Sequence, residues 1–175
     1  GVLHRDIKPS NLFVTEREAG ELDVTIIDLG VAFADDEQQL TLHGSIVGTP
    51  SYLAPELITG ERPTVQVDVF SLGVVLYELL ARDKAYRGET AFAIIAKIVL
   101  VDPPRLAVTA PHLPAYLDEL CAGAMSKDPG GRFATADELA AAGGAPEVPV
   151  LVTKRGAGGV TVRWPAGSAD IPAPA

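Results

Sequence analysis

The sequence of 175 residues is poor in three features that would each indicate a particular class of protein. Its one cysteine, Cys121, excludes a disulfide within the chain and fits a reducing compartment. Its 14 Lys and Arg are outnumbered by 23 Asp and Glu, which argues against nucleic acid as a partner because clustered cations bind phosphate backbones. Its longest apolar stretch, residues 69–81, is interrupted by Ser71 and Glu78 and falls short of the ~20 residues that span a bilayer. We therefore expect no nucleic-acid partner and no membrane segment in this chain.

What the chain does contain is enough apolar material for one ordinary domain and a tail. Hydrophobic residues make up 47% of the sequence and charged residues 21%, which is typical of a globular protein. The first residue is Gly1 rather than Met, which suggests that the chain is cut from a longer protein. Cys121 is expected to be a small buried apolar residue.

The order of the predicted elements indicates a mainly α domain with a small β-hairpin at its front. Residues 12–15 and 22–27 are apolar and β-branched runs separated by a polar stretch, which predicts the hairpin. Residues 31–50 have no clear period and predict a long loop, and loops of that length are often functional.

Helical patterns follow the loop. Residues 67–81 are apolar nearly all round, which predicts a central buried helix, and residues 90–101 and 113–125 predict two more. A capping box at Thr135 to Glu138 opens a short helix that ends near residue 141. The domain is therefore expected to cover residues 1–142.

Residues 4–11 read His-Arg-Asp-Ile-Lys-Pro-Ser-Asn and lie directly before the first predicted strand. Loops at the edge of a sheet are common places for catalytic groups. Phosphoryl transfer needs a proton acceptor for the attacking hydroxyl, cations on the phosphate oxygens and ligands for a metal ion. Asp6 can accept the proton, Lys8 can contact the γ-phosphate, and the amide oxygen of Asn11 suits Mg²⁺, which prefers hard oxygen ligands. The alternative is a capped turn in which Asp6 and Asn11 only satisfy backbone groups.

This segment resembles the catalytic loop of eukaryotic-type serine/threonine protein kinases, His-Arg-Asp-x-Lys-x-x-Asn, at every fixed position. Lys8, two residues after Asp6, is typical of the serine/threonine branch. A second match, Asp28-Leu29-Gly30, follows the second predicted strand and is similar to the Asp-Phe-Gly whose Asp binds Mg²⁺. Leu29 replaces the Phe, which keeps an apolar side chain but loses ring stacking. By itself, Asp-x-Gly is also an ordinary turn.

A third match runs from Gly48 to Glu56 and resembles the end of a kinase activation segment, closed by Ala-Pro-Glu. The resemblance implies that Thr49 hydrogen-bonds Asp6 and Lys8, and that this segment forms a platform for a substrate peptide. The alternative for Thr49 is a cap at a helix entry.

The same resemblance implies several structural contacts. Glu56 is expected to pair with Arg132, because an unpaired buried carboxylate is very costly. Asp68 is expected to hydrogen-bond the backbone of the catalytic loop and hold its shape. Phe13 is placed beneath the adenine of ATP, and a simple core residue is the alternative.

Arg5 raises the question of regulation. An Arg before the catalytic Asp in this family usually pairs with a phosphorylated residue of the activation segment. The candidate acceptors are Thr41, Ser45 and Thr49, of which Thr41 and Ser45 are favoured. Residues 28–56 hold five acids and no Lys or Arg, so no other cation of this segment would assist Arg5 in binding a phosphate group. The alternative is that Arg5 bonds loop carbonyls.

Taken together, the resemblance implies a protein-kinase-like fold, C-terminal lobe only, with ATP and Mg²⁺ as cofactors. The implied function is transfer of the ATP γ-phosphate to Ser or Thr of protein substrates by a cytoplasmic protein, with the parent chain free to be membrane-tethered. No Gly-x-Gly-x-x-Gly loop occurs and no strand with Val-Ala-x-Lys precedes residue 1, so this fragment is expected to be inactive alone. The alternatives are a pseudokinase or scaffold that binds partners without catalysis, and a small-molecule phosphotransferase, which the platform segment disfavours.

The tail, residues 143–175, has a different composition, rich in Pro, Ala, Gly and Val. Residues 149–153 and 160–164 are able to pair as strands across a Gly-rich turn. This pattern resembles the first two strands of a fibronectin type III domain, and a Pro/Ala-rich linker is the alternative.

Overall fold

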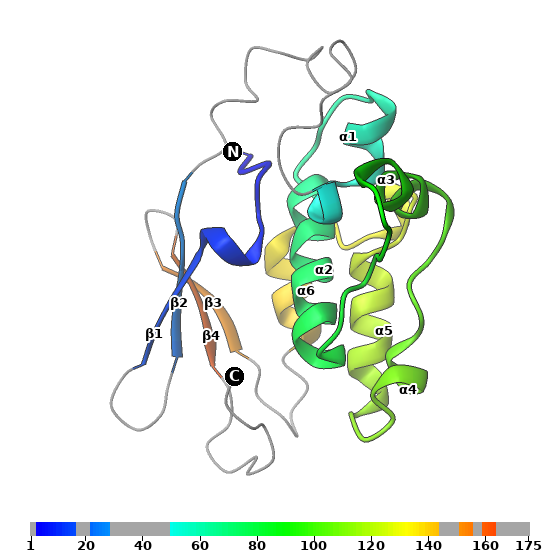
Figure 1. Cartoon of the computed structure of the whole chain (residues 1–175). Coiled ribbons are helices and arrows are strands. Elements are labelled where there is room, and N and C mark those ends of the chain that lie inside the picture. The colour runs from blue at the N-terminus through cyan, green and yellow to red at the C-terminus, as the bar shows by residue number, and fades with distance from the viewer. Residues whose placement is uncertain (1–2, 17–21, 29–49, 144–150, 156–158, 164–175) are drawn as a thin grey trace.

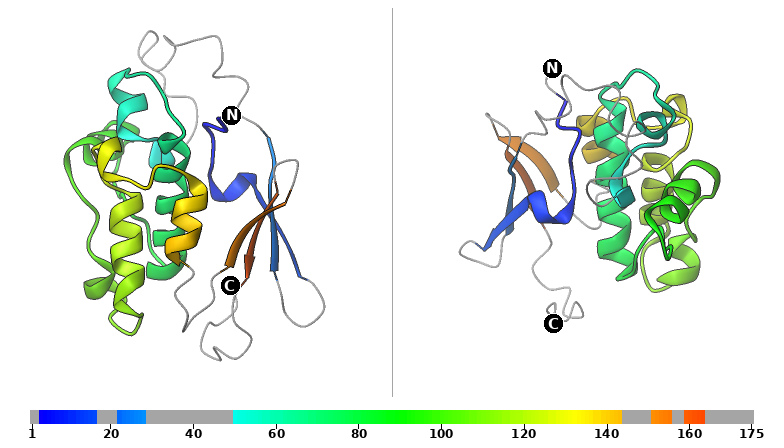
Figure 2. Two further views of the ribbon diagram at one scale, coloured as in Figure 1. Left: turned by 180° about the vertical axis from the view of Figure 1, so that it is seen from behind. Right: turned by 45° about the horizontal axis from the view of Figure 1, so that its top comes forward.

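The computed structural model describes residues 3–16, 22–28, 50–143, 151–155 and 159–163, and all that follows concerns these residues. A β-sheet lies on one side of the molecule and a layer of helices on the other (Figures 1 and 2). The segment that leads into the first strand runs between the sheet and helix α2, Gln66–Ala81. The candidate site is therefore held between the two layers.

Helix α2 is the centre of the helical layer, as the apolar run predicted. Its buried residues face several directions and include Val67, Phe70 and Val74, each with no exposed surface. At Gly73 the helix meets α5, Ala115–Ala124, so closely that an added Cβ would lie 2.7 Å from the Cβ of Ala124. The glycine is therefore required for the packing of these two helices.

The other helices surround α2, and those that were predicted have bounds close to the prediction. The remaining α-helices are α1 Pro55–Thr59, α3 Ala91–Leu100, α4 Leu106–Thr109 and α6 Ala136–Gly143. Short 3₁₀ helices occupy Pro9–Asn11, Pro50–Tyr52 and Pro129–Gly131. The capping bond predicted at Thr135 is present, because its Oγ accepts the N–H of Glu138 at 3.1 Å; the Glu138 carboxylate accepts the N–H of Ala134 at 2.9 Å, one residue before the cap. The sequence patterns missed α1 and α4, which are too short to show a helical period.

The sheet contains the predicted hairpin and two more strands. Strands β1, Leu12–Glu16, and β2, Leu22–Ile26, pair antiparallel with Leu12 opposite Ile26. Strands β3, Leu151–Arg155, and β4, Gly159–Arg163, form the hairpin expected in the tail. The strand order is β1-β2-β4-β3, because β4 pairs with β2 at Val24 and Val160. This joining of the two hairpins was not predicted, and the fibronectin interpretation of the tail stays a prediction.

Candidate active site

The loop that contains Asp6 is held by one carboxylate at the start of α2. Asp68 accepts the backbone N–H of His4 and that of Arg5, each at 2.8 Å. Hydrogen bonds to a carboxylate are roughly twice as strong as those between neutral groups. The predicted contact between Asp68 and the loop backbone is therefore present, and it connects the loop to the central buried helix α2.

Two residues of this region have left-handed backbones although neither is glycine. Arg5 has φ 62° and Asp28 has φ 57°. A side chain in this conformation is uncommon, and where the surrounding structure enforces it, the strain often marks a functional site. The two hydrogen bonds that Asp68 accepts, from the N–H groups of His4 and Arg5, fix the two peptide groups directly before the Arg5 Cα.

The three polar residues predicted to take part in phosphoryl transfer, Asp6, Lys8 and Asn11, contact one another within the loop. The side-chain amide of Asn11 donates to the backbone oxygen of Asp6 at 2.8 Å and to its carboxylate at 2.9 Å. Lys8 Nζ lies 2.8 Å from the same carboxylate, and the side chains of Lys8 and Asp6 are 28% and 29% exposed. The carboxylate is thus oriented by two neighbours and still reached by solvent. Because the Asn11 nitrogen faces Asp6, the amide oxygen is turned away from that carboxylate.

Asp28 lies at the same end of the hairpin as Asn11. The backbone N–H of Ile27 donates to the oxygen of Asn11 at 2.9 Å, which continues the pairing of Leu12 with Ile26. Asp28 follows Ile27 and is exposed. A carboxylate and an amide oxygen are ligands that suit Mg²⁺, which usually keeps waters and phosphate oxygens as its remaining ligands. This donor set fits the metal predicted from the sequence, and the described residues hold no cluster of three or more His, Cys, Asp or Glu that would offer an all-protein site.

The remaining residues of the predicted site are Phe13 and those of the activation segment. Phe13 is 58% exposed, so its alternative interpretation as a core residue is wrong for this chain, and its role beneath adenine stays a prediction. Thr41, Ser45, Thr49 and Leu29 lie outside the described residues, and their predicted roles stay predictions.

The predicted pair of Glu56 and Arg132 is present and is buried. Arg132 donates to both carboxylate oxygens of Glu56, at 2.6 and 2.8 Å, and the side chains are 0% and 4% exposed. Arg132 also donates to three backbone oxygens, those of Gln66, Ser126 and Lys127. The guanidinium and the carboxylate are therefore satisfied where water is absent, which a buried charge requires.

Tyr52 is a residue of the site region whose contacts the sequence patterns did not predict. Ser71 Oγ donates to the backbone oxygen of Tyr52 at 2.7 Å, and the Tyr52 hydroxyl donates to Glu78 at 2.8 Å. Burial is the main cause that raises the pKa of Tyr52. Ser71 and Glu78 are the two polar residues that interrupt the apolar run of α2, so a search for their partners would have been the signal for this clamp.

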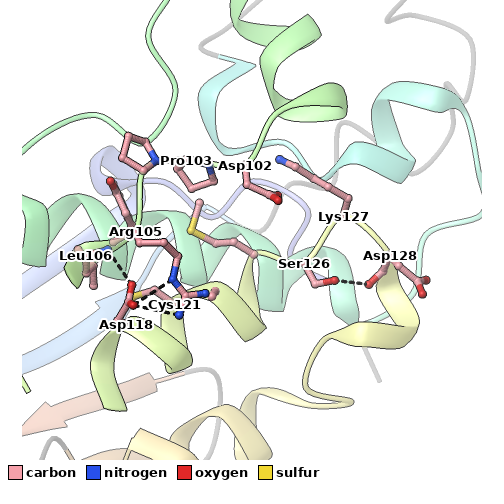
Figure 3. Close-up of a pocket in the computed structure, with 13 residues that line it drawn as sticks. Asp102, Pro103, Arg105, Leu106, Asp118, Cys121, Ser126, Lys127 and Asp128 are labelled. Carbon is pink, nitrogen blue, oxygen red and sulfur yellow. Dashed lines mark hydrogen bonds and ion pairs between the residues drawn. The ribbon is translucent and has the colours of Figure 1, made fainter. Parts of the chain in front are cut away.

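A cavity of about 400 Å³ lies apart from this loop, between α2, α5 and residues 102–106 and 125–128 (Figure 3). Among the described residues that line it, none belongs to the predicted site. On its wall, Asp118 accepts from Arg105 Nε at 3.0 Å and from the N–H of Leu106 at 2.7 Å. These bonds fix the segment between α3 and α5, so we interpret the wall as structural.

Two other residues of the cavity wall have strongly shifted pKa values. Burial lowers the pKa of Lys127 to about 8, and its Nζ donates to the Tyr86 hydroxyl at 2.7 Å. Burial raises the pKa of the Cys121 thiol to about 12. Cys121 is 2% exposed, which confirms the expected buried apolar role.

Comparison with known proteins agrees with the geometry. The family model described as protein kinase domain matches residues 1–142. The chain is 41% identical over 143 residues to a probable serine/threonine-protein kinase PknB of Bifidobacterium longum, an alignment that covers 79% of this chain and 20% of that protein. It is 37% identical over 147 residues to the serine/threonine-protein kinase PknJ of Mycobacterium tuberculosis, covering 83% of this chain and 25% of that protein. It is 34% identical over 142 residues to PknH of the same organism, covering 81% and 22%.

The fold, the loop and these matches together define the C-terminal lobe of a kinase-like fold. The chain belongs to the protein kinase domain family, with bacterial serine/threonine kinases among its relatives. It spans a quarter or less of the length of the relatives compared. No helix in the described ranges is both long enough and apolar enough to cross a bilayer.

Proposed function

We propose that the longer protein containing this lobe is a serine/threonine protein kinase that transfers the γ-phosphate of ATP to protein Ser or Thr residues. The observation that carries the proposal is the loop geometry, in which Asp6 is oriented by Lys8 and Asn11 and remains accessible to solvent. Asp28 and Asn11 at one end of the hairpin suit the metal that such a reaction needs.

Each side chain has a defined part in this proposal. Asp6 accepts the proton of the attacking hydroxyl, and its two fixed neighbours hold the carboxylate in one orientation. Lys8 places its positive charge beside the transferred phosphoryl group. The amide oxygen of Asn11 and the carboxylate of Asp28 hold Mg²⁺, which neutralises charge on the phosphate oxygens when bound. Phe13, exposed on β1, contacts the adenine.

The remaining predicted roles belong to regulation and placement. Arg5 pairs with a phosphorylated Thr41 or Ser45, and Thr49 bonds Asp6 and Lys8. The chain alone does not turn over ATP, because the glycine-rich loop and the lysine-bearing strand of a kinase are not within it. The protein is cytoplasmic, a placement that the reduced lone cysteine supports.

The test is phosphotransfer to a serine peptide by the longer protein and by this chain alone. Asp6→Asn is expected to lower kcat in the longer protein by roughly 10²–10⁴-fold, the usual contribution of a general base. Asp137→Asn, at an exposed site on α6, is the matched control and is expected to leave kcat unchanged. The scaffold alternative would be supported instead by a longer protein that binds partners but transfers no phosphate, or whose transfer is unchanged by Asp6→Asn.

A further inference from the structure

A cluster of three side chains joins the end of the platform segment to the end of α2. The Tyr52 hydroxyl donates to Glu78 Oε2 at 2.8 Å. Lys84 Nζ donates to the same Glu78 oxygen at 2.9 Å and to the Tyr52 hydroxyl at 2.9 Å. Glu78 Oε1 accepts the N–H of Ala85 at 3.4 Å. The carboxylate is thus surrounded by donors, of which Lys84 brings the positive charge.

The turn after α2 places Lys84 over this carboxylate. Arg82, at the C-cap of the helix, is in the left-handed conformation with φ 55°, which reverses the chain. The side chain of Asp83 then accepts the N–H of Lys84 at 2.7 Å, and the Ala85 N–H points back at Glu78. The backbone at Lys84 is therefore held by contacts other than the ion pair with Glu78.

Lys84 reaches Glu78 from the solvent side. Its side chain is 56% exposed, whereas that of Glu78 is 10% exposed. The hydrogen bond to Tyr52 is the main cause that raises the pKa of Lys84, so the amine stays charged at neutral pH. The route along which Lys84 approaches is open to water, and another cation is able to approach along it once Lys84 is removed.

The location of the cluster connects it with substrate binding. Tyr52 ends the short helix Pro50–Tyr52, inside the stretch that precedes α1 and that we expect to bind a substrate peptide. Ser71 fixes the Tyr52 backbone on α2, so Tyr52 and Glu78 are held by the same helix. A nearly buried carboxylate at the border of a peptide platform is a strong site for a guanidinium or ammonium group.

We propose that Lys84 is a specificity-determining residue, which fills a carboxylate subsite of Glu78 beside the peptide platform and so removes selection for basic side chains in the substrate. The proposal rests on the proposed kinase function. With Lys84 in place, an arginine of the peptide gains no free partner at Glu78. Without Lys84, Glu78 keeps its donors Tyr52 and Ala85 but lacks a positive charge, and it selects an arginine or lysine of the peptide.

Peptide binding by the 175-residue chain tests this inference without relying on catalysis. The probes are serine peptides that carry arginine at each flanking position in turn, and the same peptides with citrulline, which has arginine's shape but no charge. We expect wild type to bind both sets alike and Lys84→Met to bind one arginine peptide about tenfold more tightly than its citrulline twin. A tenfold gain corresponds to about 1.4 kcal/mol, which is modest because the subsite is partly open to water once Lys84 is removed.

Two variants isolate the cause. Lys97→Met removes a charge at an exposed position on α3 that, within the described part of the chain, bonds neither Tyr52 nor Glu78, and it is expected to show no preference for arginine. The double variant Glu78→Gln with Lys84→Met is expected to lose the preference that Lys84→Met gains. Lys84→Gln, which keeps a hydrogen-bond donor, replaces Lys84→Met if the latter does not fold.

The outcomes separate this inference from the proposed function. A folded Lys84→Met or Lys84→Gln chain that binds arginine and citrulline peptides equally, or binds neither, overturns the inference, and so does a wild type that already selects arginine. The same peptides are then assayed for phosphotransfer by the longer protein. Absence of transfer by wild type, together with the tenfold binding preference in the variant, contradicts the kinase function and leaves the subsite in place.

Discussion

The ion pair in the catalytic loop and the ion pair between Glu56 and Arg132 are built from the same chemistry and differ in their contact with water. The Asp6–Lys8 pair is partly exposed and has a hydrogen bond from Asn11. The Arg132–Glu56 pair is buried and is surrounded by backbone oxygens. The charges of the loop are accessible to water, whereas the charges that join distant segments are buried within the helical layer. We therefore expect the loop to govern chemistry and the buried pair to govern stability.

The largest effect is expected from breaking the buried pair. Arg132→Met leaves the Glu56 carboxylate buried without its partner, and the free energy of unfolding should fall by about 3–5 kcal/mol. Urea unfolding followed by circular dichroism measures the loss. Glu56→Gln combined with Arg132→Met removes both charges and should cost less than Arg132→Met alone. A loss below ~1 kcal/mol for Arg132→Met would show that the two pairs do not differ as we describe.

Cys121 offers a second probe of the sealed helical layer. Its pKa of about 12 means that almost no thiolate forms at pH 8, so alkylation of the folded chain should be ~10³-fold slower than that of the unfolded chain, given tenfold less thiolate per pKa unit. Iodoacetamide labelling with and without urea measures the ratio. Comparable rates in both would contradict the burial of α5 against α2.

The same thiol predicts a direction for the stability at high pH. The unfolded thiol ionises near its model value of 9.0 while the folded thiol stays protonated to about 12. Its contribution is therefore fully present below pH 9 and is lost as the pH rises towards 12. Cys121→Ala is expected to decline less steeply than wild type across this interval in urea unfolding, and an identical slope would contradict the shift.

An intermediate effect is expected at the junction of loop and core. Asp68→Asn removes the charge that holds the His4 and Arg5 amides and places an NH₂ group against one of them, so the cost is about 1–3 kcal/mol. Hydrogen exchange of the His4 and Arg5 amides should accelerate. Asp137→Asn, on the exposed face of α6, serves as the control. Unchanged exchange at both amides in Asp68→Asn would mean that other contacts fix the loop.

The smallest effect is expected from the exposed pair. Lys8→Met removes a charge that water already reaches, and the free energy of unfolding should change by less than about 1 kcal/mol. The measurement is the same urea unfolding used for Arg132→Met. A cost equal to that of Arg132→Met would erase the distinction between the two regions.

Local patterns were sufficient to predict the elements and several contacts. The hairpin of β1 and β2, the central helix α2 and the capping bond at Thr135 follow from period and capping, and the structure confirms them. The contacts of Asp68 with the loop and of Glu56 with Arg132 were inferred from motif resemblance. Their partners lie far apart in the sequence, so residue spacing alone would not have paired them.

The features that were missed depend on long-range packing. The contacts of Tyr52 require Ser71 and Glu78 to face one particular loop, and Lys84 joins them from the turn that follows the left-handed Arg82. Neither fact has a local signature. The joining of β4 to β2 likewise depends on two short stretches meeting from opposite ends of the chain.

The most direct test of the central claim is paramagnetic broadening by Mn²⁺, which takes the oxygen ligands that suit Mg²⁺, in an NMR titration of this chain. The account predicts that amides around Asn11 and Asp28 broaden together, that Asp28→Asn removes the effect at both places, and that Asp137→Asn leaves it intact. Absence of broadening around Asn11 and Asp28, or broadening that survives Asp28→Asn, would contradict a metal site at this end of the hairpin.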